Sequence, residues 1–231
     1  MAAHHCFSPG EREGVYRAIR ERRDIRSGFR PEPLDHALLR QLLNAAHQAP
    51  SVGLMQPWHF VLIENRQTKQ AVHDLFLEAN RAASSIYEEG RAAAYSALKL
   101  AGILESPHNL CVACDSTAAR GSGLGRQTMP ETAIYSAVCA VQNLWLAARA
   151  EGVGVGWVSI LEPEKVKGLL HIPPSMALVA YLCIGYVERF REIPELEILN
   201  WEKRIPLDAV LHYESFSSTG DLFEDRDDAV S

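Results

Sequence analysis

Three arginines surround one aspartate in a short stretch near the start of the chain, Arg22-Arg23-Asp24-Ile25-Arg26. The whole chain carries a formal net charge of −6, so this local excess of positive charge stands out. A guanidinium presents a planar set of donors that can bind two phosphate oxygens at once. The stretch therefore indicates a site for a phosphate monoester. The alternative is a solvated helix end whose arginines interact with the helix dipole and pair with Glu21 and Asp24.

The loop at residues 50–57 could contact another part of such a ligand. It lies between two prolines, has Gly53 at its centre, and offers the hydroxyl of Ser51 and the amide of Gln56. Small residues with free backbone N–H groups allow a planar ligand to approach closely. An ordinary connection between a helix and a strand is the alternative.

A third candidate segment is 152–159, where glycines alternate with valine and tryptophan. Glycines inside a strand allow another backbone or a flat ring to lie close. Ser159, at the end of this strand, is a candidate site hydroxyl, and a capping or turn residue is the alternative. Lys203 and Arg204 add two cations after the last predicted strand.

These groups together suit a flat aromatic ligand that carries a phosphate, with cations at the phosphate, amides at the ring edge and apolar residues on its faces. No metal site is expected, because none of the nine histidines stands in ligand spacing with a carboxylate. Cys111 and Cys114 are three residues apart on a predicted strand, so they point to opposite faces. The glycines of residues 121–125 lack the third glycine of a dinucleotide-binding turn.

Hydrophobic periodicity and capping residues predict one α+β domain over residues 8–214, in which helices outnumber a few interior strands. Ser8 with Glu11, and Thr128 with Glu131, are predicted capping boxes. The helix after Thr128 is apolar enough to lie in a large core or a subunit interface. The other predicted elements are helices at 34–49, from a Thr68 cap to about 105 with a break near Gly90, and from Pro163, and strands at 58–63, 110–114, 152–159 and 177–186.

Composition restricts the class of protein. The chain has 231 residues, 47% of them hydrophobic and 23% charged, as in soluble globular proteins. No apolar run approaches the ~20 residues that cross a bilayer, and residues 1–10 lack signal-peptide features. Five cysteines without a framework of spacings favour a reducing compartment. We therefore expect a cytoplasmic protein that binds neither membrane nor nucleic acid, with an acidic, disordered tail at residues 215–231.

The chain resembles the nitroreductase-fold flavoproteins, and specifically the 5,6-dimethylbenzimidazole synthases, the branch that consumes reduced FMN. The resemblance covers nearly all of residues 8–214. It is carried by the segments 15–19, 22–24, 45–53, 55–58 and 135–159. The Arg-Arg-Asp-x-Arg and Gln-Ala-Pro-Ser-Val-Gly elements are shared more narrowly than the general fold.

This resemblance implies a central mixed β-sheet of four or five strands flanked by helices, in an intertwined homodimer with FMN at the subunit interface. The arginines would hold the phosphate, the 50–57 loop would contact the flavin or its ribityl chain, and residues 78–105 would form a lid. The residues implied to bind the cofactor are Arg22, Arg23, Arg26, Arg204, Ser51, Gln56 and Leu100.

The implied reaction uses FMNH2 and O2 and fragments the flavin to 5,6-dimethylbenzimidazole, the lower ligand of cobalamin, and erythrose 4-phosphate. Asp24 would act as general base or proton shuttle, and Ser159 would position or relay. A separate flavin reductase would supply the reduced FMN, because no dinucleotide fingerprint is found. The alternatives are an NAD(P)H-dependent FMN nitroreductase that keeps its flavin, and a flavin-binding storage or sensor protein without turnover.

Overall fold

The computed structural model describes residues 5–216, without the side chains of residues 89 and 90. The chain divides into two compact units, Met1–Glu192 and Ile193–Ser231. The first unit contains the sheet, and the described part of the second contains α7 (Glu195–Ile198) and a 3-10 turn at Leu207–Ala209. Residues 217–231, which make up most of the predicted tail, lie outside the described part. None of the described helices is long and apolar enough to cross a membrane.

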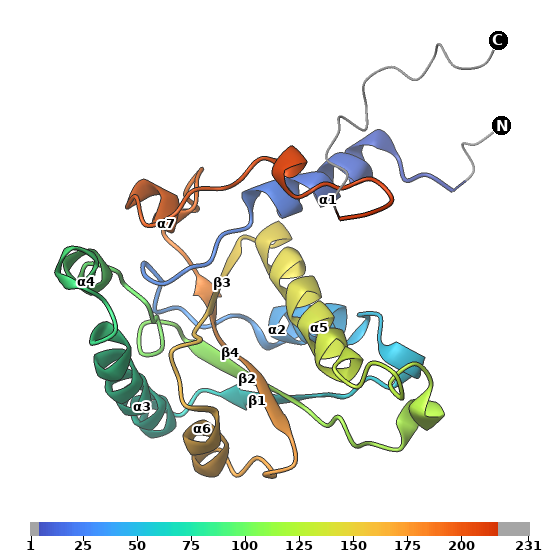
Figure 1. Cartoon of the computed structure of the whole chain (residues 1–231), viewed down its shortest axis with the longest axis horizontal. Helices are drawn as coiled ribbons and strands as arrows, with labels where there is room; N and C mark the ends of the chain where they lie inside the picture. The colour runs from blue at the N-terminus through green and yellow to red at the C-terminus, as the bar shows by residue number, and fades with distance from the viewer. Residues whose placement is uncertain (1–4, 217–231) are drawn as a thin grey trace. The chain divides into compact units, whose positions relative to one another are not determined.

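Four strands of the first unit form one sheet in the order β1-β2-β4-β3 (Figure 1). Their bounds are Trp58–Ile63 for β1, His108–Cys114 for β2, Val153–Trp157 for β3 and Ala177–Tyr186 for β4. All four predicted strands are therefore confirmed within a few residues. The expectation of a mixed sheet is wrong for these strands, because every ladder is antiparallel. Among the described residues, parallel pairing is limited to an isolated bridge between Asp24 and Val155.

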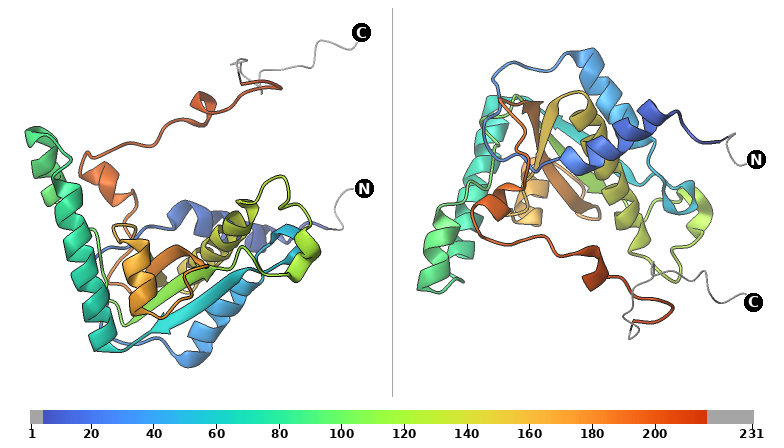
Figure 2. Two further views of the ribbon diagram at one scale, coloured as in Figure 1. Left: turned by 60° about the horizontal axis from the view of Figure 1, so that its bottom comes forward. Right: turned by 90° about the horizontal axis from the view of Figure 1, so that it is seen from above.

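Helices cover both faces of the sheet (Figure 1, Figure 2). The helices on one face are α2 (His36–His47) and α5 (Thr132–Ala150), with α1 (Pro9–Glu21) packed against α5. The helices on the other face are α3 (Arg66–Ser84) and α6 (Pro163–Leu169). The predicted α+β class is confirmed, and the two faces give two separate hydrophobic clusters.

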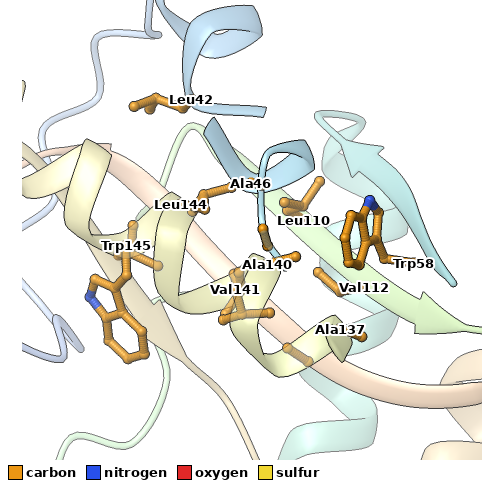
Figure 3. Close-up of a cluster of buried hydrophobic side chains, with 14 of the residues drawn as sticks. Leu42, Ala46, Trp58, Leu110, Val112, Ala137, Ala140, Val141, Leu144 and Trp145 are labelled. Carbon is orange, nitrogen blue, oxygen red and sulfur yellow. The ribbon is translucent and has the colours of Figure 1, made fainter. Parts of the chain in front are cut away.

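Alternate residues of the central strands contribute to the two clusters. Leu182 of β4 belongs to the cluster under α5, and its neighbour Cys183 belongs to the cluster under α3. Cys111 and Cys114 of β2 are likewise divided between the clusters, which confirms that they face opposite sides of the sheet. Figure 3 shows the first cluster, where side chains of α5 such as Val141 meet the sheet.

Capping explains where the helices begin. The capping box of Ser8 and Glu11 at the start of α1 is confirmed, and Asp35 caps α2. The predicted Thr68 cap is wrong, because the side chain of Asn65 accepts hydrogen bonds from two backbone N–H groups and starts α3 at Arg66. The second predicted box is also wrong. Glu131 precedes α5 with no side-chain cap, while Thr132 donates its hydroxyl to the carbonyl of Met129.

The segment predicted as a lid has less helix than expected. After α3 ends at Ser84, α4 (Glu89–Ser96) continues in the same direction beyond the sheet, and residues 97–107 are irregular (Figure 2). The helix ends at Ser96 rather than near residue 105, and Ile103 in the irregular part is only 1% exposed and packs into the cluster under α3. The segment therefore returns to the sheet as a packed, non-helical connection.

Candidate active site

The carboxylate of Asp24 is fixed against the edge strand β3. Beside it, the N–H of Ile25 donates to the carbonyl of Val155 at 3.0 Å. Oδ1 of Asp24 accepts the backbone N–H of Trp157 at 2.9 Å, and Oδ2 accepts Nε and Nη2 of Arg26 at 2.9 and 2.8 Å. The two side chains are 27% and 17% exposed, so the ion pair is largely removed from water. Both oxygens of Asp24 are therefore held in defined directions.

The glycines of β3 make this contact possible. A Cβ on Gly156 would lie 1.8 Å from the carbonyl oxygen of Ile25, and a Cβ on Gly154 would lie 2.4 Å from Val187. The backbone of Ile25 occupies the space at Gly156, and the side chains of Val187 and Ile25 occupy it at Gly154. The prediction that these glycines allow another backbone to lie close is confirmed.

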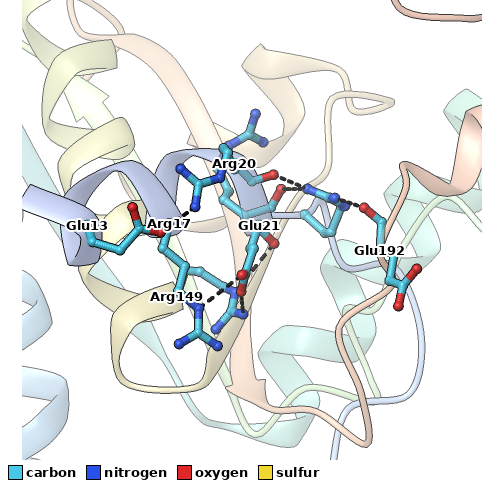
Figure 4. A network of polar contacts seen from close by, with 8 residues as sticks. Glu13, Arg17, Arg20, Glu21, Arg149 and Glu192 are labelled. Carbon is cyan, nitrogen blue, oxygen red and sulfur yellow. Dashed lines mark hydrogen bonds and ion pairs between the residues drawn. The ribbon is translucent and has the colours of Figure 1, made fainter.

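The three arginines have three different kinds of contact. The guanidinium carbon of Arg22 lies 5.1 Å from the ring centroid of Trp145, a cation–π arrangement. Arg23 donates to the carbonyls of Arg20 and Arg22, both at 2.7 Å, and to the carbonyl of Glu192 (Figure 4). Arg26 pairs with Asp24. The structure thus brings the predicted arginines together at the end of α1, with Arg23 turned toward the last carbonyls of that helix.

A second set of charges joins the end of α1 to the end of α5 (Figure 4). Glu21 accepts Nε of Arg17 at 2.9 Å and pairs closely with Arg149 of α5. The hydrogen bond from Arg17 is the main reason that the pKa of Glu21 lies below its usual value. The guanidinium of Arg149 also lies 4.3 Å from the ring of Phe190. The contact of Arg149 with the end of α1 could not be predicted from the sequence, because nothing in the pattern of α5 indicates which helix end this residue meets.

Hydrogen bonds from its own polar groups hold the conformation of the predicted loop at 50–57. Oγ of Ser51 accepts the N–H of Gln56 at 3.1 Å, and Gln56 has a positive φ of 49°. The amide of Gln56 donates to the carbonyl of His47 at 3.4 Å and accepts from Arg120 at 3.3 Å. A positive φ in a residue other than glycine is strained and occurs often at functional sites.

Ser136 attaches this loop to α5. Its hydroxyl accepts the N–H of Val52 at 3.0 Å and donates to the carbonyl of Thr132 at 2.7 Å. This role of Ser136 could not be predicted from the sequence, because a serine on the core side of an apolar helix commonly bonds only to its own helix.

The two candidate regions lie at opposite ends of α5. We name residues 22–26 the arginine half-site, and Ser51 with Gln56 the loop half-site. The loop half-site is attached at Ser136, and the arginine half-site follows Glu21, which is held by Arg149. At a rise of 1.5 Å per residue these two attachment points are about 20 Å apart. One chain therefore does not bring the two half-sites together.

The other predicted site residues are spread more widely. Ser159 is exposed and follows Trp157 by two residues. Leu100 is half-buried and packs against the cluster under α3. Arg204 is exposed in the second unit. The Trp157 N–H, which binds Asp24, could not be found from sequence, because a backbone donor carries no sequence signal.

Comparison with known proteins agrees with this architecture. The model of the Nitroreductase family matches residues 19–186. A 5,6-dimethylbenzimidazole synthase from Rhodospirillum rubrum is 46% identical over 200 residues, which cover 87% of this chain and 94% of that protein. Another from Rhodobacter capsulatus is 40% identical over 200 residues, covering 87% and 96%.

A solved structure shares the fold. It is the crystal structure of oxidized iodotyrosine deiodinase bound to FMN and 3-iodo-L-tyrosine, with a TM-score of 0.65 and 21% identity over 77% of this chain and 91% of that chain. The chain therefore belongs to the nitroreductase family, in the group of its 5,6-dimethylbenzimidazole synthases.

Proposed function

We propose that this protein fragments reduced FMN with O2 to 5,6-dimethylbenzimidazole and erythrose 4-phosphate, and so supplies the lower ligand of cobalamin. The observation that carries this proposal is the Asp24 carboxylate, fixed from two sides and set among three arginines. It occurs in a chain that is 46% identical to a 5,6-dimethylbenzimidazole synthase over 87% of its length.

The donor groups of the two half-sites fit the parts of FMN. Arg22 and Arg26 would hold the phosphate, Arg23 would hold the helix end behind them, and Arg204 is a further candidate. Ser51 and Gln56, on a strained loop, would contact the ring or the ribityl chain. The bound reduced flavin supplies the electrons that O2 accepts.

Asp24 is the group best placed to move a proton. The Trp157 N–H and the Arg26 guanidinium hold its two oxygens, so the carboxylate meets a bound ligand in one orientation. It would accept a proton from the junction of the ribityl chain and the ring. Ser159 would position the ligand or relay that proton. Leu100 and the segment that carries it would exclude water.

Complete sites require two copies of the chain. The two points at which the half-sites of one chain are attached to α5 are about 20 Å apart, so each half-site needs its complement from elsewhere. Apolar side chains are exposed on the outer faces of α1 and α5, namely Val15, Tyr16, Ile19, Ile134, Tyr135 and Val138. A twofold axis between two α5 helices would bury these faces. It would also bring the arginine half-site of one protomer to the loop half-site of its partner.

This homodimer can be tested by sedimentation. Val138→Asp, which places a charge on the exposed face of α5, should give monomers and weaken FMN binding. Asp74→Asn on the exposed surface of α3 should leave the dimer intact. A monomeric wild-type protein with full activity would contradict the shared site.

One experiment separates the proposed activity from its alternatives. The protein is loaded with reduced FMN without oxygen, then exposed to air, and the products are separated by chromatography. Formation of 5,6-dimethylbenzimidazole supports the proposal. Reoxidation with peroxide and intact FMN would identify a flavin-retaining reductase, and bound FMN without turnover would identify a binding protein. Reduced FMN made chemically should suffice, because we propose that a separate flavin reductase supplies it.

Replacing Asp24 tests its role directly. Asp24→Asn keeps an oxygen for the Trp157 N–H but cannot accept a proton, so FMN binding should change little while benzimidazole formation is lost. Asp74→Asn, an exposed control on α3, should behave as wild type. An undiminished product yield from Asp24→Asn would refute the assignment.

A further inference from the structure

Lys69 is a buried cation on which the charge of Glu64 has only a minor effect. Its side chain is on the core face of α3, in line with Val72 and Phe76, and the residue is only 7% exposed. Among the ion pairs formed by the described residues, none includes Lys69. Burial is the main cause that lowers its pKa. Burying a charge that has no ion-pair partner costs free energy, so other contacts of Lys69 must compensate for its burial.

The ammonium group of Lys69 is used to bind backbone carbonyls. Nζ donates to the carbonyl of Ser106 at 2.8 Å and to that of Pro107 at 3.3 Å. The hydroxyl of Ser106 accepts Nδ2 of Asn109 at 2.6 Å, and Oδ1 of Asn109 accepts the hydroxyl of Tyr181 at 2.8 Å. Lys69 therefore joins α3 to a buried polar cluster built on β2 and β4.

This cluster fixes the connection at residues 101–107, which we name the strap. A Cβ on Gly102 would lie 2.6 Å from the ring of Phe29 and 3.5 Å from the carbonyl oxygen of Arg26. At the other end, Pro107 lies against Gly185 of β4, where a Cβ would come within 2.5 Å of the proline ring. The strap is thus packed directly behind the segment that follows Asp24. Leu100, the residue predicted to face the flavin, immediately precedes it.

We propose that Lys69 is a positioning residue for the active site, which acts by holding the strap against Arg26 and Phe29. It contacts neither Asp24 nor the proposed flavin site. Without it, the buried carbonyl of Ser106 and the half-buried carbonyl of Pro107 lose this donor. The strap then loosens, and the backbone behind the Asp24–Arg26 pair loses its support. The end of the predicted lid that joins the strap, at Leu100, loosens at the same time. This inference rests on the proposed function for its effect on products, but not for its effect on the strap.

The chain offers a matched control in Lys167 of α6. This lysine is 5% exposed, and its Nζ also donates to two loop carbonyls, those of Pro174 and Met176, at 2.9 and 3.0 Å. The loop it holds precedes the start of β4, whereas the strap meets Gly185 near the end of that strand. The two places are about 25 Å apart at the rise of a β-strand. Nζ of Lys167 also pairs with the exposed carboxylate of Glu164 at 2.8 Å. Lys167→Met therefore removes two similar bonds to loop carbonyls, together with this ion pair, far from the strap.

The experiment compares wild type, Lys69→Met and Lys167→Met as full chains. Backbone hydrogen exchange in the strap and at residues 26–29 should become at least about tenfold faster in Lys69→Met only. After reduced FMN meets air, the ratio of benzimidazole to peroxide should fall about fivefold or more in Lys69→Met only, because water and oxygen reach a looser site. Both variants should lower the melting temperature.

Lys69→Arg should restore slow exchange, because its guanidinium also donates to carbonyls. Gly102→Ala should reproduce the change in product ratio with Lys69 intact, because the added methyl group pushes the strap away from Phe29. If Lys69→Met fails to fold, Gly102→Ala takes its place in the comparison. Strap exchange and product ratios equal to those of Lys167→Met, or an unchanged ratio in Gly102→Ala, would overturn the proposal. If the wild type forms no benzimidazole, the proposed function is refuted. The hydrogen-exchange measurement would still test whether Lys69 holds the strap.

Discussion

Gly156→Ala is the smallest change that should separate Asp24 from β3. The added methyl group would lie 1.8 Å from the carbonyl oxygen of Ile25, which is backbone and cannot rotate away. The segment at 24–25 must therefore move off the strand. Its movement breaks the bond from the Ile25 N–H to Val155, and the bond from the Trp157 N–H to the Asp24 carboxylate.

The cost can be estimated from these two bonds. A neutral hydrogen bond contributes about 1 kcal/mol, and one to a charged acceptor about 1.5–3 kcal/mol. Crowding in a packed region adds about 1 kcal/mol or more. We therefore expect Gly156→Ala to lower the free energy of unfolding by about 3–5 kcal/mol, a large part of the usual ~5–15 kcal/mol.

The assay is urea unfolding of the variant beside Gly168→Ala. Gly168 is in α6, and a Cβ there would meet nothing within 4 Å. Alanine in a helix is favoured over glycine by up to ~1 kcal/mol, so this control should be neutral or slightly stabilising. The folded fraction of Gly156→Ala should also lose benzimidazole formation. If Gly156→Ala unfolds at the same urea concentration as Gly168→Ala and makes product normally, the backbone contact does not have the role assigned to it.

Three further predictions concern other contacts. Ser136→Ala should destabilise the fold by about 1–3 kcal/mol, since the half-buried Val52 N–H loses its acceptor, and should raise the KM for reduced FMN through the loop half-site. Arg23→Met should lower the melting temperature even without flavin, because the carbonyls at the end of α1 lose their donor; an effect seen only on flavin affinity would contradict this. Stability should fall above pH 9, because burial raises the pKa of Cys111 to about 12 from 9.0. As the pH rises, the thiol of the unfolded chain loses its proton before the buried thiol does, which favours unfolding. The free energy of unfolding should therefore fall by roughly 1.4 kcal/mol per pH unit for each such thiol. Cys111→Ala should make the free energy of unfolding, measured by urea titration, fall less steeply with pH.

Local patterns predicted the elements of this fold well, because strands and helices depend on spacings within one segment. The glycines of β3 predicted a close backbone contact, although not that residues 24–25 would make it. The predicted Thr68 cap was wrong because the side chain of Asn65, three residues earlier, accepts the N–H groups of Gln67 and Thr68 and so starts the helix before Thr68. Lys69 could have been noticed, since its spacing from Val72 and Phe76 puts a lysine on the buried face of α3.

The site was harder to predict, because its residues meet through contacts between distant segments. Nothing local in α5 indicates that Ser136 meets the 50–57 loop or that Arg149 meets the end of α1. The length of α5 then determines that the half-sites are separated, a geometric fact that a list of site residues does not contain. The candidate residues were found from their types and from the family resemblance, but their division into two halves required the fold.

The arginines illustrate how similar residues acquire different roles. From their residue type alone, Arg22, Arg23 and Arg26 are equivalent candidate phosphate ligands. In the structure they contact an aromatic ring, backbone carbonyls and a carboxylate respectively. A guanidinium has five N–H donors, and the carboxylate of Asp24 engages only two nitrogens of Arg26. Arg26 can therefore bind a phosphate while it holds Asp24. In the proposed reaction the same side chain would then link the anchored end of the substrate to the orientation of the base.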